Sequence, residues 1–258
     1  MDGVAYLMYH ELERTGRALC HSGPGYVRYV LSESEFHSHL ASLRANCFHG
    51  LSVSEALRTD ADSPAVVLTF DDGCETDLIT AAPALAESGL HATFYVVSGF
   101  LGRRGYLSRL QLKELSNLGF EIGCHSRTHA YLPNLDAASL REEIAVAKAE
   151  LEQILGRLVE HFSCPGGRWS PNAAKAATEV GFRSMATSRL GANSPSADRY
   201  RLARVALQRG ISLPQFERLC HGNGLLARRG RGALLQAAKM LLGDTFYELV
   251  RSRILGCH

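Results

Sequence analysis

The amino-acid sequence predicts an α/β fold in which crossover helices cover a parallel sheet. Short apolar segments rich in β-branched residues alternate along the chain with longer segments whose apolar residues recur at helical spacing. The length of 258 residues also suits one barrel-like α/β domain, or such a domain with a modest appendage. In folds of this kind the chemistry lies at the carboxyl ends of the strands. The residues that follow each apolar segment are therefore the first candidates for function.

The first predicted strand covers residues 4–9 and ends just before His10. A loop is expected over residues 11–30, where glycine and proline recur. Ser32 and Glu35 have the spacing of a capping box, which predicts a helix that begins after Ser32. The same reasoning predicts strands at 65–70, 91–97, 120–124, 160–164 and 182–187, and helices at 75–88, 108–118, 136–155 and from Pro171 to about Gly181.

Two adjacent acidic residues, Asp71 and Asp72, follow the apolar strand at 65–70. Carboxylates that cluster at the end of a buried strand cost free energy unless a cation or a proton compensates their charge. A bound metal ion would supply that compensation. The sequence Asp-Asp-Gly is also common in ordinary turns, so a turn without catalytic function is an open alternative.

Two histidines four residues apart, His125 and His129, follow a later strand. On one helical turn this spacing would place both imidazoles on the same face, as in many sites where two histidines bind one metal. Two unrelated histidines would give the same spacing. Together with one carboxylate they form a set of ligands that suits Zn²⁺, with Co²⁺ or Ni²⁺ as alternatives.

The segments 69–73 (Thr-Phe-Asp-Asp-Gly) and 125–129 (His-Ser-x-x-His) resemble the first two motifs of the polysaccharide deacetylases, carbohydrate esterase family 4. The resemblance extends over about residues 4–205. It implies an incomplete, distorted (β/α) barrel of the NodB homology type. It also implies that Asp71 is the general base. The metal ligands would then be Asp72, His125 and His129.

The third motif of this family, Arg-x-Pro-x-Gly, is matched only in part by residues 163–167. Ser163 stands where the family has the arginine that steadies the catalytic aspartate. Arg168 is a candidate to replace it, with a solvent-facing arginine as the alternative. The turn Pro165-Gly166-Gly167 is expected to offer a backbone N–H to an oxyanion, and Trp169 to stack on a sugar or to pack in the core.

Tyr9-His10-Glu11 resembles the N-terminal motif of the permuted subgroup that includes poly-N-acetylglucosamine deacetylases. In that subgroup the N-terminal histidine is the general acid, so the resemblance assigns this role to His10. The Leu-x-His motif that other members carry near the C-terminus is not evident after residue 205, and His221 follows a cysteine instead.

The resemblance implies a hydrolase that removes N-acetyl groups from an N-acetylhexosamine-containing glycan, in the biosynthesis of a surface polysaccharide or exopolysaccharide. The expected partner is a carbohydrate. One alternative is a metal-dependent amidohydrolase that acts on a small non-sugar amide or imide. Another is a catalytically silent carbohydrate-binding module, which the departure at Ser163 favours.

The distribution of charge predicts two parts, a catalytic domain at 1–205 and a basic helical extension at 206–258. The net charge is only +2, but residues 201–258 hold ten Lys and Arg against three Asp and Glu. Such a region could make peripheral contact with an anionic membrane surface, although a solvated arginine-rich helix face is the simpler interpretation. No base-reading motif suggests nucleic acid, and no apolar stretch is long enough to span a bilayer.

A cytoplasmic location is expected, because no export signal is visible at the N-terminus. The seven cysteines are scattered and odd in number, and none form a Cys-x-x-Cys pair. A reduced state is therefore expected rather than a disulfide framework.

Overall fold

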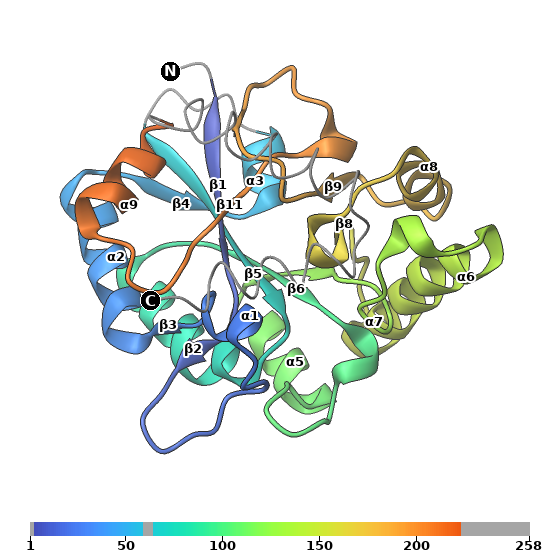
Figure 1. The fold of residues 1–258 in the computed structure, drawn as a ribbon, viewed down its shortest axis with the longest axis horizontal. Coiled ribbons are helices and arrows are strands. Elements are labelled where there is room, and N and C mark those ends of the chain that lie inside the picture. Colours follow the sequence, from blue (N-terminus) through green and yellow to red (C-terminus); the bar gives the residue numbers. More distant parts are fainter. Residues whose placement is uncertain (1–2, 59–63, 223–258) are drawn as a thin grey trace.

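The structure, a computed structural model, describes residues 3–58 and 64–222. Its centre is a curled sheet of nine strands that forms a half-barrel, with helices packed around its outer surface (Figure 1). The continuous path through the sheet is β10-β1-β5-β6-β7-β8-β9, and β4 and β11 pair with β5 and β1. This architecture confirms the predicted open (β/α) barrel of the NodB type.

Six strands of the sheet, β1 and β5 to β9, coincide with the apolar segments that were predicted as strands. The strands of the sheet are parallel to their neighbours except at β10, which runs antiparallel to β1. Their bounds are β1 Val4–Tyr9, β4 His49–Leu51, β5 Ala65–Asp72, β6 Thr93–Val96, β7 Glu121–Cys124, β8 His161–Ser163, β9 Ser184–Ala186, β10 Ala192–Asn193 and β11 Val205–Ala206.

The helices predicted between residues 33 and 181 are present, and two of them contain a π-helical segment. Ser32 caps α2 through a capping box with Glu35, and Asp136 caps α6, as the sequence indicates. The longer helical elements are α2 Glu33–Ala45, η1 Asp77–Ala81 continued by α4 Ala82–Ser88, α5 Arg109–Asn117, α6 Ala137–Arg141 with η4 Glu142–Val146 and α7 Ala147–Leu155, α8 Pro171–Glu179 and α9 Leu213–Cys220.

Several short elements are absent from the sequence-based prediction. The segment 11–30 is not all loop, because it contains β2 (Leu12–Glu13) and α1 (Pro24–Val27), and β2 pairs with β3 (Leu31–Ser32). Strand β4 and helix α3 (Val53–Arg58) were likewise not predicted. Elements of two to six residues are too short to show a period of 2 or 3.6, so their sequences carry little signal.

A row of buried aromatic rings holds the centre of the sheet to the helices outside it. Tyr9 stacks on Phe70 at 5.0 Å between ring centroids, and Phe70 stacks on Phe94 at 4.7 Å. Phe36 of α2 meets Phe70 edge to face at 5.7 Å. These rings are fully buried. They hold β1, β5 and β6 in register, and this register places the polar residues that follow them side by side.

The described part of the C-terminal extension, residues 206–222, packs against the barrel. Phe216 of α9 stacks on His39 of α2 with ring centroids 3.9 Å apart, and the Ser42 hydroxyl donates to Glu217 at 2.8 Å. The rest of the predicted basic helical extension, residues 223–258, lies outside the described residues. Among the residues that are described, no helix has the length and apolar character needed to cross a membrane.

Candidate active site

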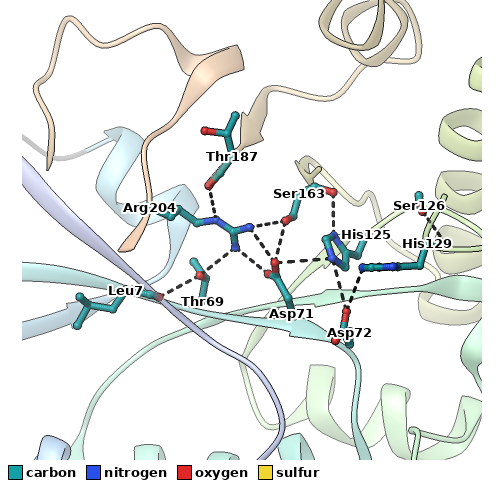
Figure 2. Close-up of polar contacts among 10 residues, drawn as sticks. All are labelled: Leu7, Thr69, Asp71, Asp72, His125, Ser126, His129, Ser163, Thr187 and Arg204. Atoms are coloured by element: carbon teal, nitrogen blue, oxygen red, sulfur yellow. Dashed lines mark hydrogen bonds and ion pairs between the residues drawn. The ribbon is translucent and has the colours of Figure 1, made fainter. Parts of the chain in front are cut away.

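The candidate active site lies at the carboxyl edge of the sheet, where the chemistry was expected. Strand β5 extends through Asp71 and Asp72, so the two acids are strand residues and the turn begins only at Gly73. Successive strand residues point to opposite faces, and the positive φ of 86° at Asp72 turns this side chain further. The two carboxylates therefore enter different surroundings, although they are adjacent in the chain (Figure 2).

Asp71 is held by Arg204, a fully buried arginine that precedes β11. The guanidinium donates Nη1 to Oδ1 at 2.7 Å and Nη2 to Oδ2 at 2.8 Å, a two-pronged ion pair (Figure 2). Burial by itself would raise the pKa of Asp71, but the charge of Arg204 and its hydrogen bonds hold that pKa well below its usual range. Asp71 is therefore an ionised carboxylate that is fixed in position.

Three further contacts hold the Arg204 guanidinium itself. It donates to the carbonyl of Thr187 at 3.0 Å, to the hydroxyl of Thr69 at 3.2 Å, and to the hydroxyl of Ser163 at 2.7 Å. The Ser163 hydroxyl in turn donates to Asp71 at 3.2 Å. Ser163 thus takes part in the same network, although it stands at the position where the family motif has arginine.

The hypothesis that Arg168 replaces the missing motif arginine is wrong for the contact with Asp71. The guanidinium of Arg168 lies over the ring of Tyr131, 3.7 Å from its centroid, while both Asp71 oxygens are paired with Arg204. Arg204 is 133 residues from Asp71 in the chain. The sequence offers one indication of it, a single arginine inside the apolar run 202–207 (Leu-Ala-Arg-Val-Ala-Leu).

Asp72, His125 and His129 converge, as the sequence predicts for a metal site. Their candidate ligand atoms all lie within 4.8 Å of one another. The Nε2 atoms of His125 and His129 are each 3.6 Å from Oδ1 of Asp72, and Nε2 of His125 is 3.7 Å from Oδ2 of Asp71. These separations exceed a direct N–H···O hydrogen bond. The side chains are aimed at a shared point rather than bonded to one another.

The tautomer of His125 shows that this point suits a cation. Its Nδ1 lies 2.8 Å from the carbonyl oxygen of Ser163, which can only accept, so Nδ1 carries the proton. Burial lowers the pKa of His125 to about 3, so the ring is neutral near pH 7 and Nε2 presents a lone pair to the carboxylates. Burial also raises the pKa of Asp72 to about 6. Acceptors that face acceptors require a cation or a proton between them, and a divalent metal fits this set of ligands.

The two histidines do not share a helical turn, which corrects the reasoning from their spacing. Residues 125–129 form an irregular loop, with positive φ angles of 66° at Ser126 and 64° at His129. The Ser126 hydroxyl accepts from the N–H of His129 at 3.0 Å, and Glu143 accepts from the N–H of Thr128 at 2.9 Å. A loop held in this way brings both imidazoles to Asp72 without helical geometry.

His10 follows β1 beside the acid pair. The register pairs Tyr9 with Phe70, so His10 continues β1 next to the position of Asp71. A positive charge on His10 would lower the pKa of both Asp71 and Asp72, which places the ring in their electrostatic field. Its Nδ1 is buried and has no hydrogen-bond partner among the described residues. The structure thus brings His10 to the site, and its role as an acid stays a prediction.

The turn Pro165–Gly167, which we call the rim turn, begins two residues after Ser163, whose carbonyl lies 2.8 Å from Nδ1 of His125, a candidate metal ligand. It is a short 3₁₀ turn with left-handed glycines, φ 59° at Gly166 and 67° at Gly167. A Cβ at Gly167 would lie 2.0 Å from the Ser188 hydroxyl, and one at Gly166 would lie 2.8 Å from the Tyr131 ring, so glycine is required at both positions.

Trp169 lies partly buried against the core. Its indole N–H donates to the Tyr200 carbonyl at 2.8 Å, and the Arg201 guanidinium is 4.6 Å from its ring centroid. These contacts give the ring a packing role. They leave stacking on a sugar as a prediction.

Comparisons with known proteins agree with this fold and with the family that the motifs predict. The family model for polysaccharide deacetylase matches residues 58–185. YxkH of Bacillus subtilis strain 168 is 28% identical over 215 residues, which are 81% of this chain and 73% of YxkH. The solved structure of IcaB from Ammonifex degensii superposes with a TM-score of 0.72 at 25% identity, over 86% of this chain and 97% of IcaB.

A second relative has a more specific description. The peptidoglycan-N-acetylglucosamine deacetylase of Bacillus cereus is 30% identical over 121 residues, which are 46% of this chain and 54% of that protein. With the fold, the motifs and these matches together, the chain belongs to the polysaccharide deacetylase family. His10 and Arg204 both lie outside the residues that the family model matches.

Proposed function

We propose that this protein is a metal-dependent deacetylase that removes N-acetyl groups from an N-acetylhexosamine-containing glycan. Family membership supports deacetylation, and the relative from Bacillus cereus is described as acting on N-acetylglucosamine units of peptidoglycan. One observation carries the proposal: an ionised, immobilised Asp71 stands beside a set of ligands whose lone pairs face one another. A base next to a cation site is what the hydrolysis of an unactivated amide requires.

The metal would be held by Asp72, His125 and His129, with Zn²⁺ the first expectation from two imidazoles and one carboxylate. When bound, a divalent cation at this point supplies Lewis acidity toward a carbonyl and lowers the pKa of a nearby water. The proton on Nδ1 of His125 is directed to the Ser163 carbonyl, which keeps Nε2 available as a ligand.

Asp71 is proposed to accept the proton of the attacking water. Arg204 keeps the carboxylate ionised near neutral pH, and its two hydrogen bonds hold the carboxylate in one orientation. The same pairing makes Asp71 an intrinsically weak base. Its effectiveness therefore depends on its position and on the acidity of the water, more than on its own pKa.

The rim turn supplies the backbone donor that we propose for the developing oxyanion. Within the turn, the N–H groups of Gly167 and Arg168 donate to the carbonyls of Cys164 and Pro165, at 2.7 and 3.2 Å. Pro165 has no N–H. The oxyanion contact is therefore assigned to the N–H of Gly166, where the left-handed backbone allows close approach.

His10 is proposed to protonate the departing amine. It stands on the β1 side of Asp71, and its buried Nδ1 has no partner among the described residues. Donation of a proton to nitrogen completes the reaction, because a deprotonated amine is a poor leaving group. The products are acetate and a glycan with a free amine.

The biological context is also part of the proposal: the substrate is a surface polysaccharide or exopolysaccharide. Support comes from the description of the Bacillus cereus relative, whose named substrate, peptidoglycan, is a cell-surface polymer. A small non-sugar amide is the alternative substrate for the same residues.

The direct test is acetate release from a set of N-acetylglucosamine oligomers by protein stripped with a chelator and then reloaded with Zn²⁺, Co²⁺ or Ni²⁺. We expect acetate only from reloaded protein and an equal number of new amines on the sugar. Asp71→Asn should bind the metal and release little acetate. Oligomer binding without acetate release under every metal would support a silent binding module, and turnover of small imides alone would exclude the glycan.

A further inference from the structure

Two cysteines with no part in the proposed deacetylation lie in contact beside the catalytic strand. The Sγ atoms of Cys20 and Cys74 are 3.7 Å apart, although 54 residues separate them in the chain. Cys74 is buried and follows Asp72 by two positions, and Cys20 is partly exposed in the loop after β2. Disulfide formation would bring these two sulfurs from 3.7 Å to about 2.05 Å.

The backbone on the Cys20 side is fixed by a buried carboxylate. The N–H of Cys20 donates to both oxygens of Glu11, at 3.2 and 3.0 Å. The Tyr26 hydroxyl donates to Glu11 at 2.8 Å and lies 3.6 Å from the sulfur of Cys74. Glu11 is 3% exposed, so this carboxylate is a structural anchor. It holds the loop with the Cys20 sulfur directed at Cys74.

The backbone on the Cys74 side is equally well fixed. Cys74 forms an isolated antiparallel bridge with Tyr106, and the N–H of Leu107 donates to the carbonyl of Gly73 at 3.0 Å. The Cys20 thiol also lies 3.2 Å from the carbonyl of Gly105, in the same segment. Both sulfurs are thus positioned by their own backbones, and their proximity does not depend on a mobile side chain.

We propose that Cys20 and Cys74 are a redox pair that forms a reversible disulfide with a small disulfide as the oxidant. The partly exposed Cys20, as thiolate, attacks one sulfur of the oxidant, forms a mixed disulfide and releases one thiolate. Cys74 then attacks the Cys20 sulfur, gives up its thiol proton and releases the second thiolate. Two protein thiols lose two protons and two electrons, and the oxidant gains both as two thiols.

The disulfide would join the loop after β2 to Cys74, two residues beyond the end of β5. Such a cross-link closes a long segment of chain and restricts the unfolded state. The oxidised protein should therefore melt higher than the reduced protein, by roughly 4 °C or more. The stretch from His10 to Cys20, which leads away from the active site, would be fixed at both ends in the oxidised state.

The test uses the full chain, reduced, stripped with a chelator, and then exposed to glutathione disulfide. After alkylation of the remaining thiols, wild type should have lost two free thiols, and a non-reducing peptide map should show Cys20 linked to Cys74. The Cys20→Ser variant should not lose two free thiols in this way. Cys47→Ser is the matched control, because Cys47 is exposed and should leave the cross-link unchanged. Dithiothreitol should restore both thiols and the lower melting temperature.

Three results would overturn the proposal. Glutathione could remain on Cys20 as a stable mixed disulfide, or both thiols could stay reduced while Cys47 is modified. A metal site is the third possibility, because a carboxylate oxygen of Glu11 and the two sulfurs all lie within 4.8 Å of one another. If Co²⁺ added to the stripped Asp72→Ala variant gave thiolate charge-transfer absorption that Cys20→Ser removed, and the pair resisted oxidation, the site would be a metal site.

Discussion

Histidine side chains approach carboxylates at both edges of the sheet. The two clusters differ in whether each hydrogen-bond acceptor has a donor. At the carboxyl edge His125 and His129 face Asp71 and Asp72. At the amino edge, where the strands begin, His161 of β8 lies 3.5 Å from Glu121 of β7. We call these the carboxyl-edge cluster and the amino-edge cluster.

The amino-edge cluster is internally satisfied. Nδ1 of His161 is 2.8 Å from the Ser184 hydroxyl and Nε2 is 2.7 Å from the Ser54 hydroxyl, and a hydroxyl can either donate or accept. Glu121 accepts from the N–H groups of Val53 and Ser54 at 3.1 and 3.2 Å, and from a threonine hydroxyl. Every acceptor therefore has a donor, and no cation is needed.

In the carboxyl-edge cluster, some of the hydrogen-bond acceptors have a donor and others do not. Asp71 is satisfied by Arg204, whereas Nε2 of His125 presents a lone pair to Asp72 across 3.6 Å. The same residue types thus form a closed polar network at one edge and a set of acceptors that face one another at the other. Hydrogen-bond acceptors without donors, more than the presence of histidine and carboxylate, distinguish the candidate active site.

The largest effect is expected for the metal ligands. His129→Ala should remove most bound divalent metal and lower acetate release by more than about 100-fold, because a site with three protein ligands rarely tolerates the loss of one. Metal content by elemental analysis and turnover on an N-acetylglucosamine oligomer measure it. His161→Gln, at the other edge, should keep its metal. Equal metal loss in both folded variants would remove the distinction between the clusters.

The second-largest effect on turnover is expected when the proposed general acid is removed. His10→Ala should keep fold and metal but lose roughly 10²–10⁴-fold in turnover of an N-acetyl sugar, the usual contribution of general acid catalysis. An acetate ester of a good leaving group should lose much less, because its leaving group does not need a proton. Parallel amide and ester assays measure this. Equal losses on both substrates would contradict the acid role.

Arg204→Met should leave Asp71 as an unpaired buried carboxylate. The expected cost is about 3–5 kcal/mol in the free energy of unfolding at neutral pH. The pKa of Asp71 is depressed in the folded state, so the pair contributes stability above the unfolded pKa of about 3.9 and loses it as pH falls below that value. The difference in stability between wild type and variant should therefore shrink on acidification, as urea unfolding at several pH values would show.

The same variant should shift the acidic limb of the pH–rate profile to higher pH, because loss of the guanidinium raises the pKa of Asp71. Arg204→Lys keeps the charge without the two-pronged geometry, and it should recover part of the stability and most of the profile. Arg168→Ala is the matched control and should leave the acidic limb in place. A shift with Arg168→Ala and none with Arg204→Met would return the role to Arg168.

The smallest effect is expected at the amino edge. Ser54→Ala removes the hydroxyl that faces Nε2 of His161, which should cost about 1–2 kcal/mol of stability. Metal affinity and acetate release should not change, since this cluster only stabilises the sheet. Thermal unfolding measures the expected loss of stability, and metal titration measures whether metal affinity is unchanged. A variant that lost activity at unchanged stability would assign function to the amino edge as well.

The amino-acid sequence by itself determined the longer elements and the principal polar residues. Periods of apolar residues and caps such as Ser32 and Asp136 act over a few residues, so the main strands and helices were predictable. The acid pair and the histidine pair were also visible, because each is a short motif. The segments too short to show a period, β2, β4 and α3, were missed.

Only the tertiary structure decided how those residues are used. Arg204 reaches Asp71 because β11 pairs with β1 and β1 with β5, a proximity that no local pattern encodes. The loop that carries His129 takes left-handed angles where a helical turn was expected, and tertiary contacts with Glu143 hold it there. Local sequence sets backbone preferences over a few residues, whereas the meeting of side chains depends on the order and register of strands far apart in the chain.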